Sequence, residues 1–152
     1  METSVELPVL SFPDWPVKLR STGQKIEIYD GLRKRWLVLQ PEEWVRQSLI
    51  YYLKHQLGFP VSCLAIENGL QLGELKKRTD IRVYKKGVLR MLVECKAPQI
   101  ALSQDVFDQV QRYNKVLSAP YILITNGIHH LLANLSANGA TFSNQIPAYT
   151  EL

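Results

Sequence analysis

The sequence has little that would cross-link the chain or place it in a membrane. It contains only two cysteines among 152 residues, too few for a disulfide framework or a four-cysteine zinc site. No uncharged run approaches the roughly 18 apolar residues that a spanning helix needs. The first residues lack the basic and apolar regions of a secretory signal. We therefore expect a protein of the reducing cytoplasm, with no membrane partner.

Repeats and low-complexity tracts are also missing, as is the loop Gly-x-x-x-x-Gly-Lys-Ser/Thr that binds ATP in molecular motors. The composition, 46% hydrophobic and 21% charged, is that of a globular protein and excludes a disordered chain, collagen or a coiled coil. A chain of this length is expected to form one domain. We predict an irregular lead-in over residues 1–23 and a single domain over residues 24–152.

Hydrophobic periodicity and turn residues predict the elements of that domain. A hairpin around Asp30-Gly31 is expected first, and then a helix that begins at Pro41 and ends before Gly58. Ser103 is predicted to cap a second helix. The predicted strands cover residues 24–29, 35–39, 62–67, 79–84, 88–95 and 120–125, the second helix covers 104–117, and 128–135 forms a strand or a short helix. This order predicts an α/β fold, a central mixed β-sheet flanked by helices and preceded by an N-terminal β-hairpin, in which strands 88–95 and 120–125 are parallel.

Positive charge is concentrated in one stretch of the chain. The net charge is +4, yet residues 76–96 alone hold eight basic and two acidic residues, which gives +6 and leaves −2 for the rest. The stretch can be a solvated hairpin or a surface that faces phosphates. The run Arg33-Lys34-Arg35 leaves the same alternatives open, a solvated face or an extra phosphate contact.

A carboxylate and a lysine stand at the end of the apolar strand 88–95. Side chains alternate along a strand, so Glu94 and Lys96 share one face. A three-residue loop over 85–87 would pair Asp80 with Leu92 and make Glu94 its diagonal neighbour on the same face, about 7–8 Å away. A two-residue loop would turn Asp80 to the other face. The function therefore depends on a prediction of register.

These residue types suit the hydrolysis of a phosphodiester bond. Two carboxylates with several waters can hold Mg²⁺, which lowers the pKa of a bound water and stabilises charge on a phosphoryl oxygen. Lys96 can orient the attacking water or balance the developing negative charge.

The pattern Asp80, hairpin, Glu94-x-Lys96 resembles the signature of the PD-(D/E)xK nucleases. Gln109-x-x-x-Tyr113 resembles an additional motif of recombination nucleases of the RecB type and of type I restriction enzymes. A further similarity, to the N-terminal nuclease domain of type I restriction-enzyme R subunits, lies in the runs PEEWVRQ (residues 41–47) and LGFP (57–60). The resemblance covers residues 38–127, the core of the predicted domain, and implies a restriction-endonuclease-like fold and a Mg²⁺-dependent DNA endonuclease.

The resemblance also implies roles for single residues. Asp80 and Glu94 would be metal ligands, together with the backbone carbonyl of Cys95, and Mn²⁺ would be able to replace Mg²⁺. Lys96 would be the catalytic lysine. The family has one more carboxylate on the first helix, which is Glu42 or Glu43 here. Helical phase places Glu42 on the face of Val45 and Leu49, which favours Glu42 as a ligand.

The remaining candidates support the site or contact DNA. They are Gln109, Tyr113, Lys77, Arg78, Lys85 and Lys86. The expected partner is DNA, with a homodimer or other subunits of a restriction complex as further partners. Two other functions stay open: a nucleic-acid-binding module that has kept only the nuclease fold, and a nuclease subunit that is active only within a larger restriction complex.

Overall fold

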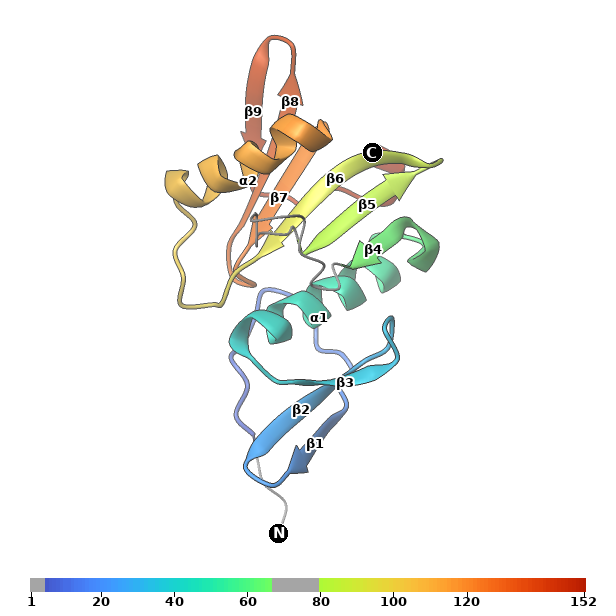
Figure 1. Ribbon diagram of the computed structural model, residues 1–152, viewed down its shortest axis with the longest axis vertical. Helices are drawn as coiled ribbons and strands as arrows, with labels where there is room; N and C mark the ends of the chain where they lie inside the picture. Colours follow the sequence, from blue (N-terminus) through green and yellow to red (C-terminus); the bar gives the residue numbers. More distant parts are fainter. Residues whose placement is uncertain (1–4, 67–79) are drawn as a thin grey trace.

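The computed structural model describes residues 5–66 and 80–152, and its first sheet lies at the N-terminal end (Figure 1). This sheet has three antiparallel strands in the order β1-β2-β3, which are β1 (Leu19–Thr22), β2 (Lys25–Asp30) and β3 (Arg35–Val38). The predicted hairpin corresponds to β2 and β3. Strand β1 lies in the lead-in that was predicted to be irregular. Its residues are mostly exposed, so it lacks the apolar alternation that marks a strand.

Helix α1 (Pro41–His55) lies between the two sheets (Figure 1). Pro41 occupies the first turn as predicted, where its missing N–H costs no hydrogen bond. The helix ends two residues earlier than predicted, and Gly58 follows with a φ of 76°, a left-handed conformation that glycine adopts at little cost. The apolar residues Val45, Leu49 and Leu53 are fully buried.

The main sheet has six strands in the order β4-β5-β6-β7-β8-β9. They are β4 (Leu64–Ile66), β5 (Ile81–Lys85), β6 (Val88–Cys95), β7 (Tyr121–Thr125), β8 (His130–Ser136) and β9 (Gly139–Ser143). Among the strands of the described residues, only β6 and β7 pair in parallel, and α2 (Gln104–Leu117) connects them. The predicted mixed sheet and its crossover are confirmed. Single-turn 3₁₀ helices at Val61–Cys63 and Tyr149–Glu151 complete the described elements.

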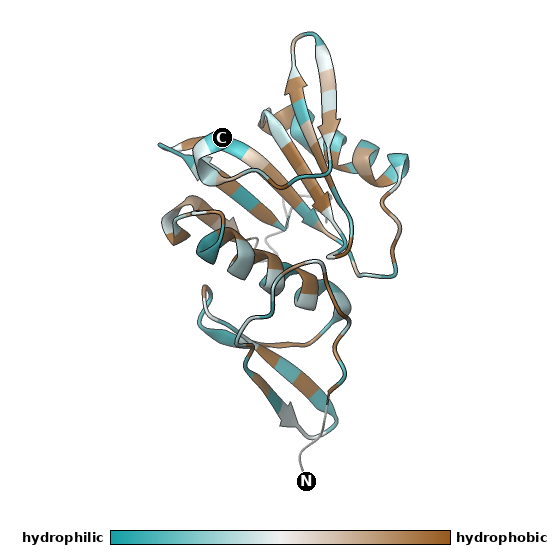
Figure 2. Cartoon of the chain, turned by 180° about the vertical axis from the view of Figure 1, so that it is seen from behind, coloured by the Kyte–Doolittle hydropathy of each residue, from teal (hydrophilic) through white to brown (hydrophobic). Residues whose placement is uncertain are grey.

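Two apolar layers cover the main sheet on its opposite faces, and Figure 2 shows apolar residues along α1 and the central strands. Met91 and Val93 of β6 pack with the apolar residues of α1. On the other face, Ile122 and Ile124 of β7 pack with α2. None of the helices in the described residues is long and apolar enough to cross a membrane.

The buried face of α2 contains a polar residue beside two apolar ones. Phe107, Val110 and Asn114 are its buried residues, whereas Tyr113 and Leu117 are only partly buried. The Asn114 side chain donates to the carbonyl of Ala119 and accepts from its N–H, at 2.9 and 2.7 Å. These two hydrogen bonds explain why a polar residue is buried at the end of this helix. Ser103 caps the helix as predicted, since its hydroxyl accepts from the N–H of Val106.

The predicted register of the β5–β6 hairpin is wrong. Lys85 pairs with Val88, so the loop has two residues, Lys86 and Gly87, instead of three. Their φ angles of 52° and 77° are both positive, as a type I′ hairpin turn requires.

A β-bulge restores the face that the short loop would have reversed. The register shifts by one residue between Val83 and Tyr84, and beyond the shift Ile81 pairs with Val93. Because a slip of one residue exchanges the faces of a strand, the loop and the bulge cancel. Continued by one position, the pairing brings Asp80 opposite Glu94, two residues farther along β6 than predicted and on the same face.

Candidate active site

The two predicted metal-binding carboxylates lie at one end of the β5–β6 pair. Asp80 directly precedes β5 and Glu94 is the second-last residue of β6, while Lys96 follows that strand. Side chains directly opposite each other in an antiparallel pair have their Cβ atoms about 4.5–5.5 Å apart. The register therefore brings together the carboxylates of two neighbouring inner strands. They lie where these strands end, so side chains from helices on both faces of the sheet can approach them.

Each carboxylate has partners among the described residues. Asp80 Oδ2 accepts a hydrogen bond of 2.7 Å from the N–H of Cys95, and Asp80 Oδ1 lies 3.5 Å from Nη1 of Arg46. Glu94 Oε1 lies 3.1 Å from Nζ of Lys96. The Asp80 and Glu94 side chains are 20% and 16% exposed, so both groups are largely removed from water yet still reachable.

Burial and mutual repulsion shape the electrostatics of the pair. Burial raises the pKa of Glu94 most, the charge of Asp80 raises it further, and Lys96 lowers it, with a net value of about 7. The pKa of Asp80 is also raised, mainly by burial and against the effects of the Cys95 N–H and Arg46. Two carboxylates that destabilise each other's charge form an environment that favours an added cation.

Lys96 remains a cation in this environment. Burial lowers its pKa, but the charge and hydrogen bond of Glu94, together with the charges of Glu42 and Asp80, outweigh that effect and the pKa is raised. Lys96 can therefore donate hydrogen bonds and supply positive charge, rather than accept a proton.

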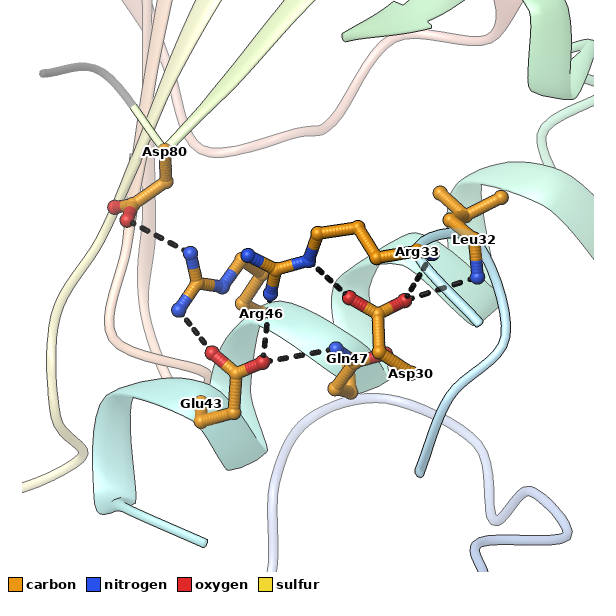
Figure 3. A network of polar contacts seen from close by, with 7 residues as sticks. All are labelled: Asp30, Leu32, Arg33, Glu43, Arg46, Gln47 and Asp80. Atoms are coloured by element: carbon orange, nitrogen blue, oxygen red, sulfur yellow. Dashed lines mark hydrogen bonds and ion pairs between the residues drawn. The ribbon is translucent and has the colours of Figure 1, made fainter. Parts of the chain in front are cut away.

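The two glutamates at the start of α1 have different environments. Glu42 is exposed, and its charge raises the pKa of both Asp80 and Glu94. Glu43 is only 4% exposed. It forms ion pairs with Arg33 and Arg46 and accepts a hydrogen bond from Gln47 (Figure 3).

The burial expected from helical phase is thus the reverse of that observed. The phase argument assumed one buried face, whereas α1 is covered by the main sheet on one side and by the N-terminal segment on another. Glu42 keeps the electrostatic link to the carboxylates, and its choice as a ligand over Glu43 remains a prediction.

Helix α2 brings Tyr113 to the site from the other face of the sheet. Burial raises the pKa of the Tyr113 hydroxyl, and the charge of Glu94 adds to this effect. Gln109, one helical turn earlier, is partly buried beside an open hollow that Asp105, Asp108 and Arg112 also line.

Two of the four predicted basic contacts lie away from the carboxylates. Lys85 and Lys86 lie at the turn of the hairpin, at the opposite end of β5 from Asp80. Lys85 Nζ also donates to the carbonyls of Tyr149 and Leu152, at 3.3 and 2.8 Å. Neither lysine lies beside the carboxylates, so DNA contact by them would be remote from the site. Lys77 and Arg78 lie outside the described residues.

Sequence analysis did not identify Arg46 as a site residue. Arg46 lies one turn after Glu43 on α1, and this spacing was the only local signal. The interpretations of Arg33 as a solvated or phosphate-binding residue are also wrong, since it is bonded to Asp30 and Glu43.

The donor set fits a hard divalent cation only in part. Among residues 5–66 and 80–152, no group of three or more His, Cys, Asp and Glu side chains is arranged to hold a metal ion. Mg²⁺, however, binds through one or two carboxylates and keeps several waters. Asp80 and Glu94 supply two such carboxylates, and their raised pKa values show that the ionised forms are destabilised. A bound Mg²⁺ would offset this destabilisation.

Comparison with known proteins agrees with the fold. None of the curated proteins compared with the chain matches it. A family model described as the N terminus of the type I restriction enzyme R protein matches residues 41–147, from the first residue of α1 to beyond β9. The matched part includes α1, both carboxylates, Lys96 and α2. Because the match covers most of the sequence, the chain belongs to the family of type I restriction enzyme R protein N-terminal domains.

Proposed function

We propose that the protein is a Mg²⁺-dependent DNA endonuclease that hydrolyses phosphodiester bonds. The observation that carries this proposal is the pair Asp80 and Glu94. The two carboxylates are largely buried and repel each other, and Lys96 Nζ lies 3.1 Å from Glu94 Oε1. Each acid has one cationic partner, Arg46 for Asp80 and Lys96 for Glu94, yet burial and neighbouring carboxylates still raise the pKa of both acids. Membership in a restriction-enzyme family supports the same reading.

The residues divide the chemistry between them. Asp80, Glu94 and Glu42 would hold the metal, together with the Cys95 carbonyl, and Mn²⁺ would be able to substitute for Mg²⁺. When bound, the ion supplies an activated water and stabilises charge on the phosphoryl group. Lys96 remains protonated, so its role is to donate a hydrogen bond to the water or to a phosphoryl oxygen and to balance the developing negative charge.

The surrounding residues fit a DNA backbone that passes along the open end of the strands. Burial and the charge of Glu94 raise the pKa of the Tyr113 hydroxyl on α2. Gln109 lies one turn away on the same helix. We propose that both contact DNA or support the carboxylates. DNA contacts by Lys85 and Lys86 would lie at the turn of the β5–β6 hairpin, remote from the carboxylates.

We also propose that cleavage serves restriction within a larger assembly. The 152 residues contain no ATP-binding phosphate loop, and the proposal assigns them no ATP-driven movement along DNA. Size-exclusion chromatography of the purified protein, alone and mixed with candidate restriction subunits, distinguishes a monomer, a homodimer and a subunit of a complex.

The decisive experiment measures the cleavage of supercoiled plasmid DNA with Mg²⁺, Mn²⁺ or Ca²⁺. Asp80→Asn and Lys96→Ala should each reduce the Mg²⁺-dependent rate by about 100-fold or more, the usual cost of losing an electrostatic catalytic group. Matched controls are Asp105→Asn and Lys115→Ala, exposed charges on α2, which should cleave at the wild-type rate.

Two results would contradict the proposal in different ways. Undiminished cleavage by both site variants would assign the activity to a contaminant or to another site. Salt-dependent DNA binding without cleavage in any of the three metals would instead identify a nucleic-acid-binding module.

A further inference from the structure

Charged side chains of alternating sign connect the N-terminal sheet to the candidate active site (Figure 3). The connection begins at Asp30, the last residue of β2, and continues through Arg33, Glu43 and Arg46 to Asp80. We refer to these five residues as the charge chain. Its members come from three parts of the sequence, so only the folded protein brings them together.

The first half of the charge chain is built around Asp30, which is fully buried. Its Oδ1 accepts from the N–H groups of Leu32 and Arg33, at 2.9 and 3.1 Å, and its Oδ2 accepts from Nε of Arg33. These contacts fix the turn that follows β2 and the direction of the Arg33 guanidinium. A buried carboxylate is stable only with such a full set of donors.

The second half uses both oxygens of Glu43. Oε1 accepts from Nη2 of Arg33 at 3.1 Å and from Nε2 of Gln47 at 2.9 Å, while Oε2 accepts from Nη2 of Arg46. Arg46 therefore bonds Glu43 through one terminal nitrogen and directs the other, Nη1, to Asp80. Its Nε is buried without a partner in the described part of the chain, so the two terminal nitrogens alone hold the guanidinium.

We propose that the β1–β3 sheet is a positioning element of the active site and acts through Arg46. Arg33 occupies one oxygen of Glu43, which prevents Arg46 from turning both terminal nitrogens onto the same carboxylate. The second nitrogen is thereby kept on Asp80, and Asp80 is oriented by it together with the Cys95 N–H. Asp30 and Arg33 precede residue 41, where the family match begins, so this contribution comes from outside the matched part of the chain.

The alternative geometry explains what would follow if Arg33 were lost. Arginine binds a single carboxylate most strongly through two parallel hydrogen bonds. Without Arg33, Oε1 of Glu43 keeps only the hydrogen bond from Gln47, so Arg46 can form that bidentate pair and leave Asp80. The carboxylate would then lose its cationic partner, its orientation would relax, and its hydrogen bond from the Cys95 N–H would open more often.

The experiment uses the backbone amide of Cys95 as a reporter, because this N–H donates directly to Asp80. The measurements are its ¹H–¹⁵N resonance and its hydrogen exchange rate in metal-free protein. In Arg33→Gln the resonance should move and exchange should become about tenfold faster, as expected when a hydrogen bond opens locally. Arg20→Gln, which removes the same charge from an exposed ion pair with Glu27 in the same sheet, should change neither.

A second set of variants keeps the test valid if Arg33→Gln fails to fold. The double variant Asp30→Asn/Arg33→Gln removes both partners of the buried pair and leaves no uncompensated charge at Asp30. It should fold and show the same change at Cys95. Arg33→Lys keeps the charge without the planar fork and should give an intermediate change.

The catalytic consequence rests on the proposed nuclease function and is measured separately. The Mg²⁺ concentration for half-maximal cleavage should rise several-fold in the double variant and stay at the wild-type value in Arg20→Gln. If the wild-type protein cleaves no DNA, the proposed function fails, and the Cys95 measurement still decides the positioning role. A folded double variant with a Cys95 amide no more altered than in Arg20→Gln would overturn the inference.

Discussion

Replacing Glu94 with glutamine should stabilise the protein at pH 8 while abolishing the proposed nuclease activity. The pKa of Glu94 is raised from its ordinary value of 4.5 to about 7, first by burial and then by Asp80. One pKa unit corresponds to about 1.36 kcal/mol, so the ionised carboxylate costs about 3 kcal/mol of folding free energy at pH 8. Glutamine has a similar shape and carries no charge, and it removes this cost.

The sign of the pH dependence follows from the direction of the shift. The folded-state pKa lies above the unfolded value, so the folded wild type takes up a proton more readily and gains stability as the pH falls from 7 toward 4.5. Glu94→Gln lacks this gain. The difference in stability should therefore be largest at pH 8 and small at pH 4.5.

Thermal unfolding monitored by circular dichroism provides the assay. For a domain of about 150 residues, 3 kcal/mol corresponds to an increase in Tm of about 6–12 °C at pH 8. Asp105→Asn, an exposed acid on α2, is the control and should show no pH-dependent difference. Adding Mg²⁺ should narrow the gap at pH 8, because the ion stabilises only the wild-type carboxylate pair. A Glu94→Gln protein whose Tm is equal to or below that of wild type at pH 8 would refute the reasoning.

Three further predictions concern the stability of the fold. Glu43→Gln should lower the unfolding free energy by about 3 kcal/mol in urea titrations, because it removes one of the two counter-charges from each of two largely buried guanidinium groups, whereas Glu42→Gln, an exposed neighbour, should stay within about 0.5 kcal/mol. Burial raises the pKa of Asp30, but Arg33 outweighs it and the pKa is lowered, so wild type should lose stability as the pH falls below about 4, and Asp30→Asn should lose less over that range in acid titrations. Ser103→Ala should cost about 1 kcal/mol in the same urea assay through loss of the α2 cap.

Local patterns predicted the elements whose causes are local. The bounds of α2 and the first residue of α1 were predicted correctly, because an N-cap serine and a proline in the first turn act on neighbouring backbone groups. Strand β9 was not predicted, since all five of its residues are exposed. Such a strand is held by backbone pairing with β8, which leaves no periodic signal in the sequence.

The candidate site was predictable in its residues but not in its contacts. Asp80, Glu94 and Lys96 were identified from their order along the chain, and alternation placed Glu94 and Lys96 on one face, in agreement with the 3.1 Å between Glu94 Oε1 and Lys96 Nζ. The register was wrong because a two-residue turn and a bulge have opposite effects that the sequence did not reveal. The partners of Glu43 were missed because they depend on how α1 packs against a separate sheet.

The position of the site explains why charged groups from both faces of the main sheet can reach it. Within the sheet, α1 and α2 are separated by a layer of buried strands, and their side chains pack into different apolar clusters. At the end of β6 this separation stops, so Arg46 of α1 contacts Asp80 while Tyr113 of α2 faces the charge of Glu94. A change in the N-terminal sheet can therefore reach the carboxylates through α1 alone, without repacking the face that α2 covers. This route makes the Cys95 amide sensitive to Arg33, and it should leave the apolar contacts of α2 unchanged.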